Sequence, residues 1–249
     1  MRYRSLVLAA VPLFLAFAAF AKSAADGEFK RTLAAPPNTA VSISTGAGYI
    51  HVSETSGDQI SVTGHVYVSR SYHGDADARL REILANPPIS QENGRILIGP
   101  HHSESYRDIA FDFDVVLPKS VSLAAATGAG EIRVAGIPSV SSISSGAGNV
   151  DLEGVSSGLK ISTGAGNILA KGTPAADWTV HSGAGNVTLE FGSNAKFNLN
   201  ASSGSGGIHV EMPILMQQTD FGNFHVRGQI NGGGPEVRIS TGSGRIHIR

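Results

Sequence analysis

The chain has 249 residues, of which 41% are hydrophobic and 16% are charged, and it contains 31 glycines and no cysteine. This composition excludes an intrinsically disordered chain, because there is enough apolar surface to form a core, and it excludes a fold held together by disulfides. The formal net charge of −1 provides no concentrated positive field, so nucleic acid is not expected as a partner.

An export signal is predicted at residues 1–21. Arg2 and Arg4 precede an apolar run that contains Pro12 and ends in Ala-Phe-Ala, which is the order of charged, apolar and small residues typical of a cleavable signal. We expect cleavage after Ala21, no stable membrane span after cleavage, and a single domain over residues 22–249. The alternative is that the apolar run is retained as a membrane anchor. The predicted location is the periplasm, the cell surface or the extracellular space.

A short phrase containing Gly-Ala-Gly or Gly-Ser-Gly recurs along the chain, as in ISTGAGNIL at residues 161–169. The second glycines of the full copies are Gly48, Gly130, Gly148, Gly166, Gly185, Gly206 and Gly244. Weaker copies that lack the first glycine occur at Gly64, Gly94 and Gly222. Recurrence at an interval of about 18–20 residues is typical of a solenoid, in which each coil buries its apolar side against its neighbours.

Apolar and polar residues alternate on both sides of each glycine pair, as in Ile132 and Val134 after Gly130. A period of two predicts two half-buried strands per coil, with the glycines at the corner between them. The sequence therefore predicts an all-β parallel solenoid with one internal aliphatic stripe, formed by Ile132, Val150, Ile168 and Val187. Trp178 has inward parity and is predicted to belong to the core.

Small polar residues occupy fixed places at the corners. Ser or Thr precedes the first glycine of every full copy, and the second glycine or its weaker counterpart is followed by Asn149, Asn167, Asn186 and Asn223. We expect both sets to form ladders, in which each hydroxyl or amide bonds to its counterpart in the adjacent coil. This interpretation makes them scaffold residues rather than a binding site.

A short helical insertion is predicted near residues 75–86. Asp75 or Asp77 would cap a segment that carries Leu80, Ile83 and Leu84 on one side, and Pro87 follows it. Such a helix is expected to cover an end or a flank of the solenoid, because a terminal coil otherwise exposes a free edge.

A second departure from the repeat follows, where residues 101–120 lack a glycine pair. The alternation of Phe111, Phe113 and Val115 predicts a strand that occupies the missing coil between Gly94 and Gly130. The adjacent Asp112 and Asp114 form a pair of carboxylates that acid–base chemistry on a sugar would use, but they also fit the solvated face of an amphipathic strand. We favour the second interpretation and expect no catalytic residues.

Histidines occur three residues after the second glycine at the C-terminal end. His209, His225 and His247 are expected on consecutive coils about 4.8 Å apart, a spacing at which imidazoles can share zinc. We favour simple exposed strand positions and predict no metal and no cofactor. His101-His102-Ser103-Glu104 is a second candidate ligand cluster, which we predict to be solvated surface.

Known glycine motifs do not explain the repeat. Val150, Ile168 and Val187 stand where calcium-binding nonapeptide repeats carry aspartate, and an apolar side chain cannot bind a hard cation. Every Gly-x-Gly leads into a predicted strand, whereas a phosphate-binding loop requires a following helix.

The coils of the type STGAG-N-I-x-L, the preceding strand FDFDVVLPKSVSL at residues 111–123 and the export signal resemble the bacterial DUF4097 and related DUF2807 proteins, which carry the names "putative adhesin" and head GIN domain. The resemblance covers about residues 27–249 and is clearest from Phe111 onward. It implies a right-handed, single-stranded parallel β-helix in the cell envelope and supplies no established catalytic residues.

We therefore predict an exported, non-enzymatic β-helix that acts as an adhesin or envelope scaffold for an unidentified protein or glycan. The alternative is a carbohydrate-active β-helix enzyme of the polysaccharide lyase or hydrolase type, since fold alone does not decide chemistry. A third hypothesis is end-to-end self-association through the strand GRIHIR at residues 244–249.

Overall fold

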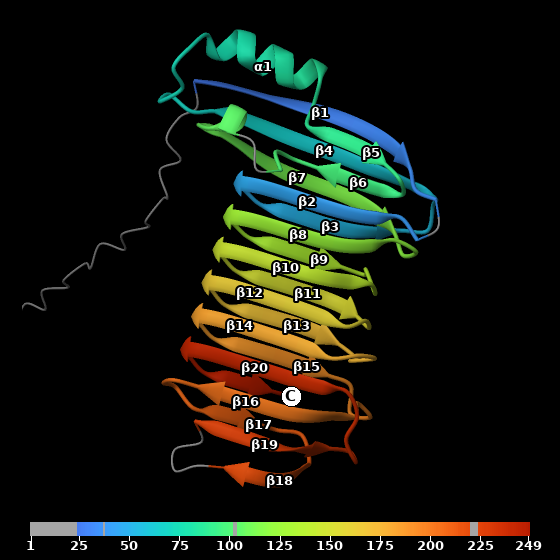
Figure 1. Cartoon of the computed structure of the whole chain (residues 1–249), viewed down its shortest axis with the longest axis vertical. Helices are drawn as coiled ribbons and strands as arrows, with labels where there is room; N and C mark the ends of the chain where they lie inside the picture. Colours follow the sequence, from blue (N-terminus) through green and yellow to red (C-terminus); the bar gives the residue numbers. More distant parts are fainter. Residues whose placement is uncertain (1–23, 37, 102–103, 220–223) are drawn as a thin grey trace, which may run out of the picture.

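The computed structural model describes residues 24–36, 38–101, 104–219 and 224–249. These residues fold mainly into strands that form two facing sheets, shown in Figure 1. In the described part of the chain, sheet A contains ten strands and sheet B eleven. The predicted all-β fold is confirmed. The predicted export signal at residues 1–21 lies outside the described residues, and the single domain over residues 22–249 stays a prediction.

Four coils in the middle of the chain stack in sequence order and form the regular part of the solenoid (Figure 1). Each coil places its first strand in sheet B, turns at its glycine pair and places its second strand in sheet A. Neighbouring coils pair in parallel. The strand pairs are β8 (Ser122–Ala129) and β9 (Ile132–Ala135), β10 (Val140–Ala147) and β11 (Val150–Val155), β12 (Leu159–Ala165) and β13 (Ile168–Gly172), and β14 (Trp178–Ala184) and β15 (Val187–Phe191). The handedness of the winding and the coil length stay predictions.

The core lies between the two sheets and is continuous from coil to coil. Ile132, Val150, Ile168 and Val187 are direct register neighbours in sheet A, and each is at most 1% exposed. The predicted aliphatic stripe is therefore confirmed. Trp178 is also fully buried, and its indole nitrogen donates a hydrogen bond to the Ser157 carbonyl at 2.7 Å.

The corner glycines are required because the backbones of adjacent coils approach closely there. Gly148 has a φ of +152°, which other residues rarely adopt, and a Cβ at this position would lie 1.9 Å from the Gly130 carbonyl oxygen. The same contact recurs from coil to coil, which explains why the chain repeats one short phrase at each of these corners.

The hydroxyl ladder differs from the prediction in its partner. Thr163 donates to the Gly148 carbonyl at 3.2 Å, and Ser182 donates to the Gly166 carbonyl at 3.1 Å. Each buried hydroxyl thus bonds to the corner carbonyl of the neighbouring coil, not to another hydroxyl, because that carbonyl needs a donor.

The asparagine side chains also form a ladder, but it differs from the prediction because the donors are backbone amides of the adjacent coil. Asn149 Oδ1 accepts from the Asn167 amide, Asn167 Oδ1 accepts from the Asn186 amide, and Asn186 Oδ1 accepts from the Arg245 amide, each at 2.9 Å. Asn223 lies outside the described residues.

At the N-terminal end, the first coil in sequence is not the first in space. The coil of β2 (Ala40–Ala47) and β3 (Ile50–Thr55) lies between the β8/β9 coil and an outer coil formed by β6 (Arg95–Ile98) and β7 (Ile109–Pro118). Outside these coils the pairing becomes antiparallel: β4 (Gln59–Val68) pairs with β7 and with β1 (Ala25–Ala34), and β5 (Ile89–Glu92) pairs with β6.

Three sequence predictions for this end were wrong. The strand that contains Phe111 does not lie next to the Gly130 coil, because the β2/β3 coil separates them. Gly64 is not a corner but lies inside β4, where a Cβ would meet the Phe29 ring at 2.3 Å. Gly94 belongs to the Asn93-Gly94 hairpin turn between β5 and β6, and both residues have positive φ.

The predicted helix is confirmed and covers this end (Figure 1). Helix α1 (Ala76–Ala85) is capped by Asp75, whose carboxylate accepts from the Ala78 amide at 2.9 Å; Leu80 and Ile83 are buried. The helix packs on β1, the edge strand of sheet A. Arg31 donates to the Ala85 carbonyl at 3.1 Å.

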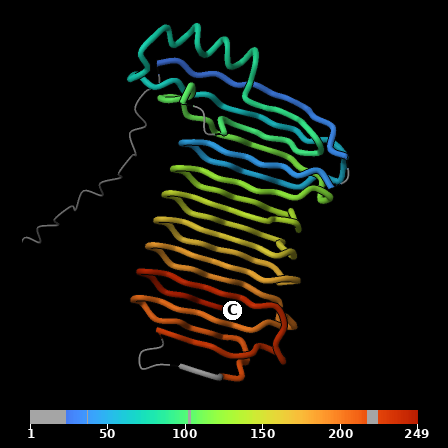
Figure 2. The backbone as a smooth tube through the Cα atoms, in the orientation of Figure 1, coloured from blue at the N-terminus to red at the C-terminus, as the bar shows by residue number. Residues whose placement is uncertain are grey.

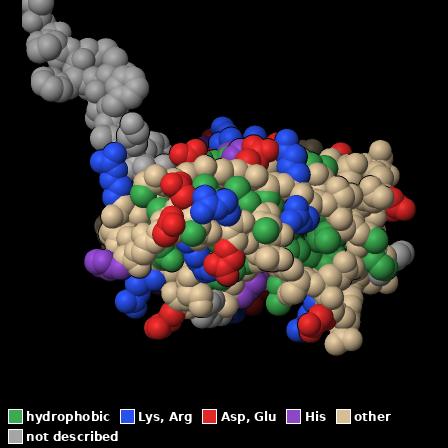
Figure 3. Space-filling model, turned by 90° about the horizontal axis from the view of Figure 1, so that it is seen from above, with side chains coloured by type: hydrophobic (Ala, Val, Ile, Leu, Met, Phe, Trp, Pro, Cys, Tyr) green, Lys and Arg blue, Asp and Glu red, His purple; other side chains and the backbone are tan. Residues whose placement is uncertain are grey.

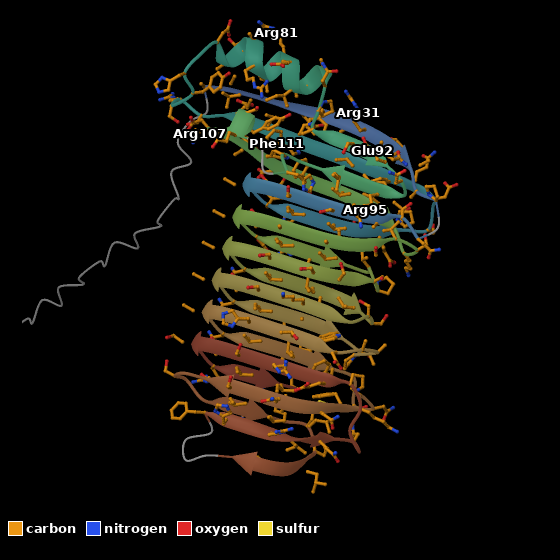
Figure 4. All side chains as sticks on the ribbon, in the orientation of Figure 1. Arg31, Arg81, Glu92, Arg95, Arg107 and Phe111 are labelled. Atoms are coloured by element: carbon orange, nitrogen blue, oxygen red, sulfur yellow. The ribbon has the colours of Figure 1, made fainter. Side chains whose placement is uncertain are left out.

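Charged side chains gather around the helix-covered end. Figure 4 shows the labelled Arg31, Arg81, Glu92, Arg95 and Arg107 there. Figure 3 looks onto this end and shows acidic and basic side chains interspersed across it. A mixed pattern of charge is suited to an exposed end that must not pair with other chains.

The C-terminal end shows the same kind of insertion. The last coil, β20 (Glu236–Ser243) and β21 (Ile246–Ile248), lies between β14/β15 and the earlier coil of β16 (Phe197–Ser203) and β17 (Ile208–Val210). Figure 2 shows the red final segment enclosed by orange ones. Beyond β16, sheet B ends in the antiparallel strands β19 (His225–Ile230) and β18 (Ile214–Thr219).

This insertion corrects the proposed surface for self-association. The strand within GRIHIR is β21, which pairs with β15 on one side and β17 on the other. It therefore offers no free edge. The outermost strands at this end are β17 in sheet A and β18 in sheet B, and self-association itself stays a prediction.

Candidate functional site

One row of outward-facing residues crosses all ten strands of sheet A in register. We name it the sheet A row; its members, from β1 to β17, are Lys30, Thr63, Asp114, His51, Arg133, Asp151, Leu169, Thr188, His247 and His209. Two of the three histidines predicted to share one outward column, His209 and His247, lie in this row. The third, His225, belongs to sheet B.

A cluster of polar and aromatic side chains on this face surrounds Asp112 and Asp114 on β7. We name it the N-terminal cluster; it contains Glu28, Tyr49, His51, His65, Tyr67, Asp112 and Asp114. These residues come from β1, β3, β4 and β7 and from the corner before β3. Sequence analysis identified the two aspartates, but the strand order that brings the histidines and tyrosines beside them could not be predicted.

Asp112 is held by the backbone and by a tyrosine. Its Oδ1 accepts from the Tyr49 amide at 2.9 Å, so it takes the place that asparagine occupies in the middle coils. Burial raises the pKa of the Asp112 carboxyl, and hydrogen bonds from the Tyr49 amide and the Tyr67 hydroxyl partly oppose that rise. Burial, followed by Asp112, also raises the pKa of Tyr67.

Asp114 lies among three neighbours with polar hydrogens. The Tyr49 hydroxyl donates to its Oδ2 at 3.0 Å, while His51 Nδ1 and His65 Nε2 lie 3.5 and 3.7 Å from its oxygens. Burial and the Asp114 hydrogen bond together raise the pKa of Tyr49 well above its usual range. The phenol therefore stays protonated and acts as a donor.

The rings of Tyr49 and His51 stack at 4.3 Å with 22° between their planes. His51 Nε2 is buried and has no hydrogen-bond partner. On the far side of β7, His65 Nδ1 lies 3.4 Å from Glu28. The cluster is thus a network of carboxylates, imidazoles and phenols fixed on four rigid strands.

The two aspartates do not have the arrangement of a free acid–base pair. Both bond to groups of the protein itself, and the structure places them on the outer face of a sheet, whereas sugar hydrolysis needs two carboxyl groups on opposite sides of a bound substrate. A hollow of about 340 Å³ lies elsewhere, on the outer face of sheet B, where β16, β19 and β20 supply Asn198, Asn200, Arg227, Gln229 and Glu236.

A second polar cluster lies at the C-terminal end of the sheet A row. His209 and His247 are register partners, with ring centroids 5.2 Å apart, and Glu211 Oε1 lies 2.7 Å from His247 Nε2. The predicted triplet with His225 was wrong, because His225 lies on β19 of the other sheet, antiparallel to β16. Glu211 was missed, although its position two residues after His209 places it on the same face.

The remaining candidate ligands form no cluster in the described residues. His102 and Ser103 lie outside them, so the predicted solvated loop at residues 101–104 stays a prediction.

Comparison with known proteins identifies the family. The family model described as Toastrack DUF4097 matches residues 23–249. The chain belongs to this family. The resemblance inferred from the repeated phrase is thereby confirmed, and for the Toastrack family it extends over the N-terminal strands as well as the regular coils.

A solved structure shows the same fold at low sequence identity. A "putative cell adhesion protein" from Clostridium sporogenes is 13% identical to this Toastrack chain, with a TM-score of 0.54, over 90% of this chain and 99% of that one. A "putative adhesin" from Bacteroides fragilis is 7% identical, with a TM-score of 0.33, over 90% and 97% of the two chains. No curated protein sequence gives a significant match.

Proposed function

We propose that this Toastrack protein is an exported, non-catalytic adhesin or envelope scaffold that binds a protein or glycan partner through the outer face of sheet A. The proposal rests on the sheet A row, whose side chains project in register from every strand of that sheet. Rigid strands hold these side chains in place before a partner arrives, which lowers the entropy lost on binding.

The chemistry of this face suits recognition of a polar partner. The N-terminal cluster presents carboxylates, imidazoles and two tyrosines, and the exposed fraction of Tyr67 is 38%. Aromatic faces with adjacent hydrogen-bonding groups are common anchors in protein interfaces. The Clostridium protein with this fold is named for cell adhesion, which agrees with such a role.

The proposed location follows from the N-terminal sequence. A charged start, an apolar run and Ala-Phe-Ala at residues 19–21 are typical of export. Among the described residues, no helix is long and apolar enough to cross a membrane. We therefore propose release into the periplasm, onto the cell surface or outside the cell. We also propose that the coils wind in a right-handed sense, as the family resemblance implies.

A carbohydrate-active enzyme remains the second candidate, because Asp112 and Asp114 lie beside Tyr49 and Tyr67 on one surface. In that case a glycan would contact the tyrosine rings and a carboxylate would act on it. The raised pKa of Asp112 is the observation that favours this candidate, since a general acid needs a pKa above that of a free carboxyl.

A binding array separates the two candidates. The purified protein is tested against glycans and solubilised envelope fractions, together with His51→Ala, Asp114→Asn and, as a control on sheet B, His181→Ala. We expect saturable binding without turnover, weakened at least about tenfold by the sheet A variants and unchanged by the control. Release of a product from any polysaccharide, abolished by Asp114→Asn, would establish the enzyme instead.

A further inference from the structure

We propose that His209, Glu211 and His247 form a zinc-binding site on the outer face of sheet A, and that zinc fastens the last coil of the chain to the coil beside it. The two histidines are 38 positions apart in the sequence. They become neighbours because β21 inserts between β15 and β17. The site therefore exists only in the folded arrangement of the coils.

The backbone places all three side chains on one face. Ile208, Ile246 and Ile248 are buried, so alternation directs His209 and His247 outward. The Glu211 amide donates to the Ile248 carbonyl at 2.8 Å, which continues the ladder past the end of β17. This bond fixes the backbone of Glu211 beside β21 and directs its carboxylate toward both imidazoles.

The distances are close to those that a zinc ion requires. His247 Nε2 and His209 Nε2 lie 2.7 and 3.9 Å from Glu211 Oε1, and one ligand atom from each residue falls within 4.8 Å of the others. Bonds of about 2.0–2.2 Å in a tetrahedral zinc site separate the ligand atoms by about 3.3–3.6 Å. Small side-chain rotations would bring the three atoms to that spacing.

Two imidazoles and one carboxylate favour a borderline transition metal over calcium or magnesium, which prefer sites made of oxygen. With three protein ligands, zinc keeps one coordination position for water. The side chains of His209 and Glu211 are 65% and 50% exposed, so the ion would be accessible from solvent.

The neighbouring charges leave Glu211 available. Arg249 interacts electrostatically with Glu211, but its guanidinium hydrogen-bonds and ion-pairs with Glu190 on β15.

Zinc binding would stabilise the fold because the unfolded chain does not hold the two histidines together. Ligands that bind only the native state raise its stability in proportion to the logarithm of their concentration. At zinc about 100 times above the Kd, we expect the thermal midpoint to rise by about 5–10 °C.

The experiment measures zinc binding by calorimetry and by thermal melting of the full chain, purified without a histidine tag. The variants are His209→Ala, Glu211→Gln and His247→Ala; His73→Ala and His181→Ala are controls at exposed histidines. We expect each site variant to weaken zinc binding more than about 100-fold, because even groups that only orient a ligand contribute about 10–100-fold. Calcium and magnesium should produce no shift.

Several outcomes would overturn the proposal. The first is that zinc neither binds to the unaltered chain nor raises its thermal midpoint. The second is that His209→Ala and Glu211→Gln bind zinc as the unaltered chain does. The third is that His51→Ala abolishes zinc binding, which would place the ion in the N-terminal cluster. His209 is exposed and outside the core, so its variant tests binding without disturbing the fold. The partner array is read separately in the presence of a chelator, so failure of the zinc site and failure of the adhesive surface are distinguishable.

Discussion

The order in which the coils stack differs between the middle and the ends of this solenoid. From β8 to β15 the coils are parallel and stack in sequence order. At each end, the first or last coil in the sequence is not the outermost coil, because a coil from another part of the chain lies outside it. Antiparallel strands then complete each end. The comparison shows that a repeat determines the shape of a coil but not its neighbours, because every coil presents a similar edge of backbone donors and acceptors.

The inserted coils also explain where the polar clusters are found. In the middle, successive coils bring together residues that are one repeat apart in the sequence, such as Val150 with Ile168. At the ends, insertion brings together residues that are distant in sequence, such as His51 with Asp114 and His209 with His247. Both clusters lie at junctions created by an inserted coil.

Removing the last coil should have the largest effect. Deletion of residues 235–249 removes Val237, Ile239, Ile246 and Ile248 from the core. It also takes away one of the two strand partners of β14, β15 and β16, and the described partner of β17. At about 1.5–3 kcal/mol per buried aliphatic side chain, the loss of about 6–12 kcal/mol is comparable to the whole stability of a domain. We expect a chain that does not fold, measured by circular dichroism and proteolysis. A terminal coil that was merely stacked on the end would leave a shorter, folded solenoid.

The corner glycines provide a matched comparison between the middle and the N-terminal end. A Cβ at Gly146 would lie 2.3 Å from the Gly128 carbonyl oxygen, whereas a Cβ at Gly46, in the equivalent position of its coil, would have nothing within 4 Å. Gly146→Ala should therefore cost about 3 kcal/mol or more, and Gly46→Ala less than about 1 kcal/mol. Denaturant unfolding measures both. Equal costs would show that backbone contact between coils is not the reason for the glycine.

The corner hydroxyls should contribute less. Thr163 is 1% exposed and donates to the Gly148 carbonyl. Thr163→Val keeps the shape of the side chain but leaves that carbonyl without this donor, so we expect a loss of about 1–2 kcal/mol in the free energy of unfolding. The exposed Thr179 is the control, and Thr179→Val should change stability by less than about 0.5 kcal/mol. Similar losses at both positions would contradict the role given to the hydroxyl.

We expect the smallest change in stability at Asp112, where the substitution should stabilise the fold. Its pKa is raised in the folded protein, chiefly by burial, so the folded state binds the proton more tightly than the unfolded state. The ionised form therefore lowers stability above the folded pKa, and this cost disappears as the pH falls. Asp112→Asn keeps an acceptor for the Tyr49 amide, so at pH 7 it should stabilise the fold by less than about 1 kcal/mol, since the carboxylate is partly solvated.

The control for this prediction is the pH dependence itself. The gain from Asp112→Asn should shrink as the pH falls through the raised pKa of folded Asp112, and it should be gone below the ordinary carboxyl pKa of about 4, where Asp112 is neutral in the folded and the unfolded protein. A variant that destabilises the protein at pH 7 but not at low pH would contradict this prediction and indicate that Tyr67 or His65 needs the charge of Asp112.

Much of the fold could be predicted from particular residues. The alternation around Ile132 and Val150 indicated which side chains are buried, and Asp75 with Leu80 and Ile83 indicated the helix that covers one end. These are local patterns, because strand alternation and helix capping depend on residues only a few positions apart.

The candidate sites were less predictable. Asp112, Asp114, His209 and His247 could be named from their outward parity, but their partners could not. Predicting consecutive coils placed His225 beside His209 and left Glu211 unnoticed, and it assigned Gly94 to a coil when it belongs to a hairpin turn. A one-dimensional repeat contains no information about which coil edge pairs with which.

The amino-acid sequence by itself therefore determined the elementary coil of this Toastrack protein: two half-buried strands joined by a corner at a glycine pair. The tertiary structure alone decided the order of the coils at both ends, and with it the composition of the N-terminal cluster and of the His209–Glu211–His247 site. The physical reason is that burial is set by local alternation, whereas the choice among equivalent backbone edges depends on contacts between residues far apart in the chain.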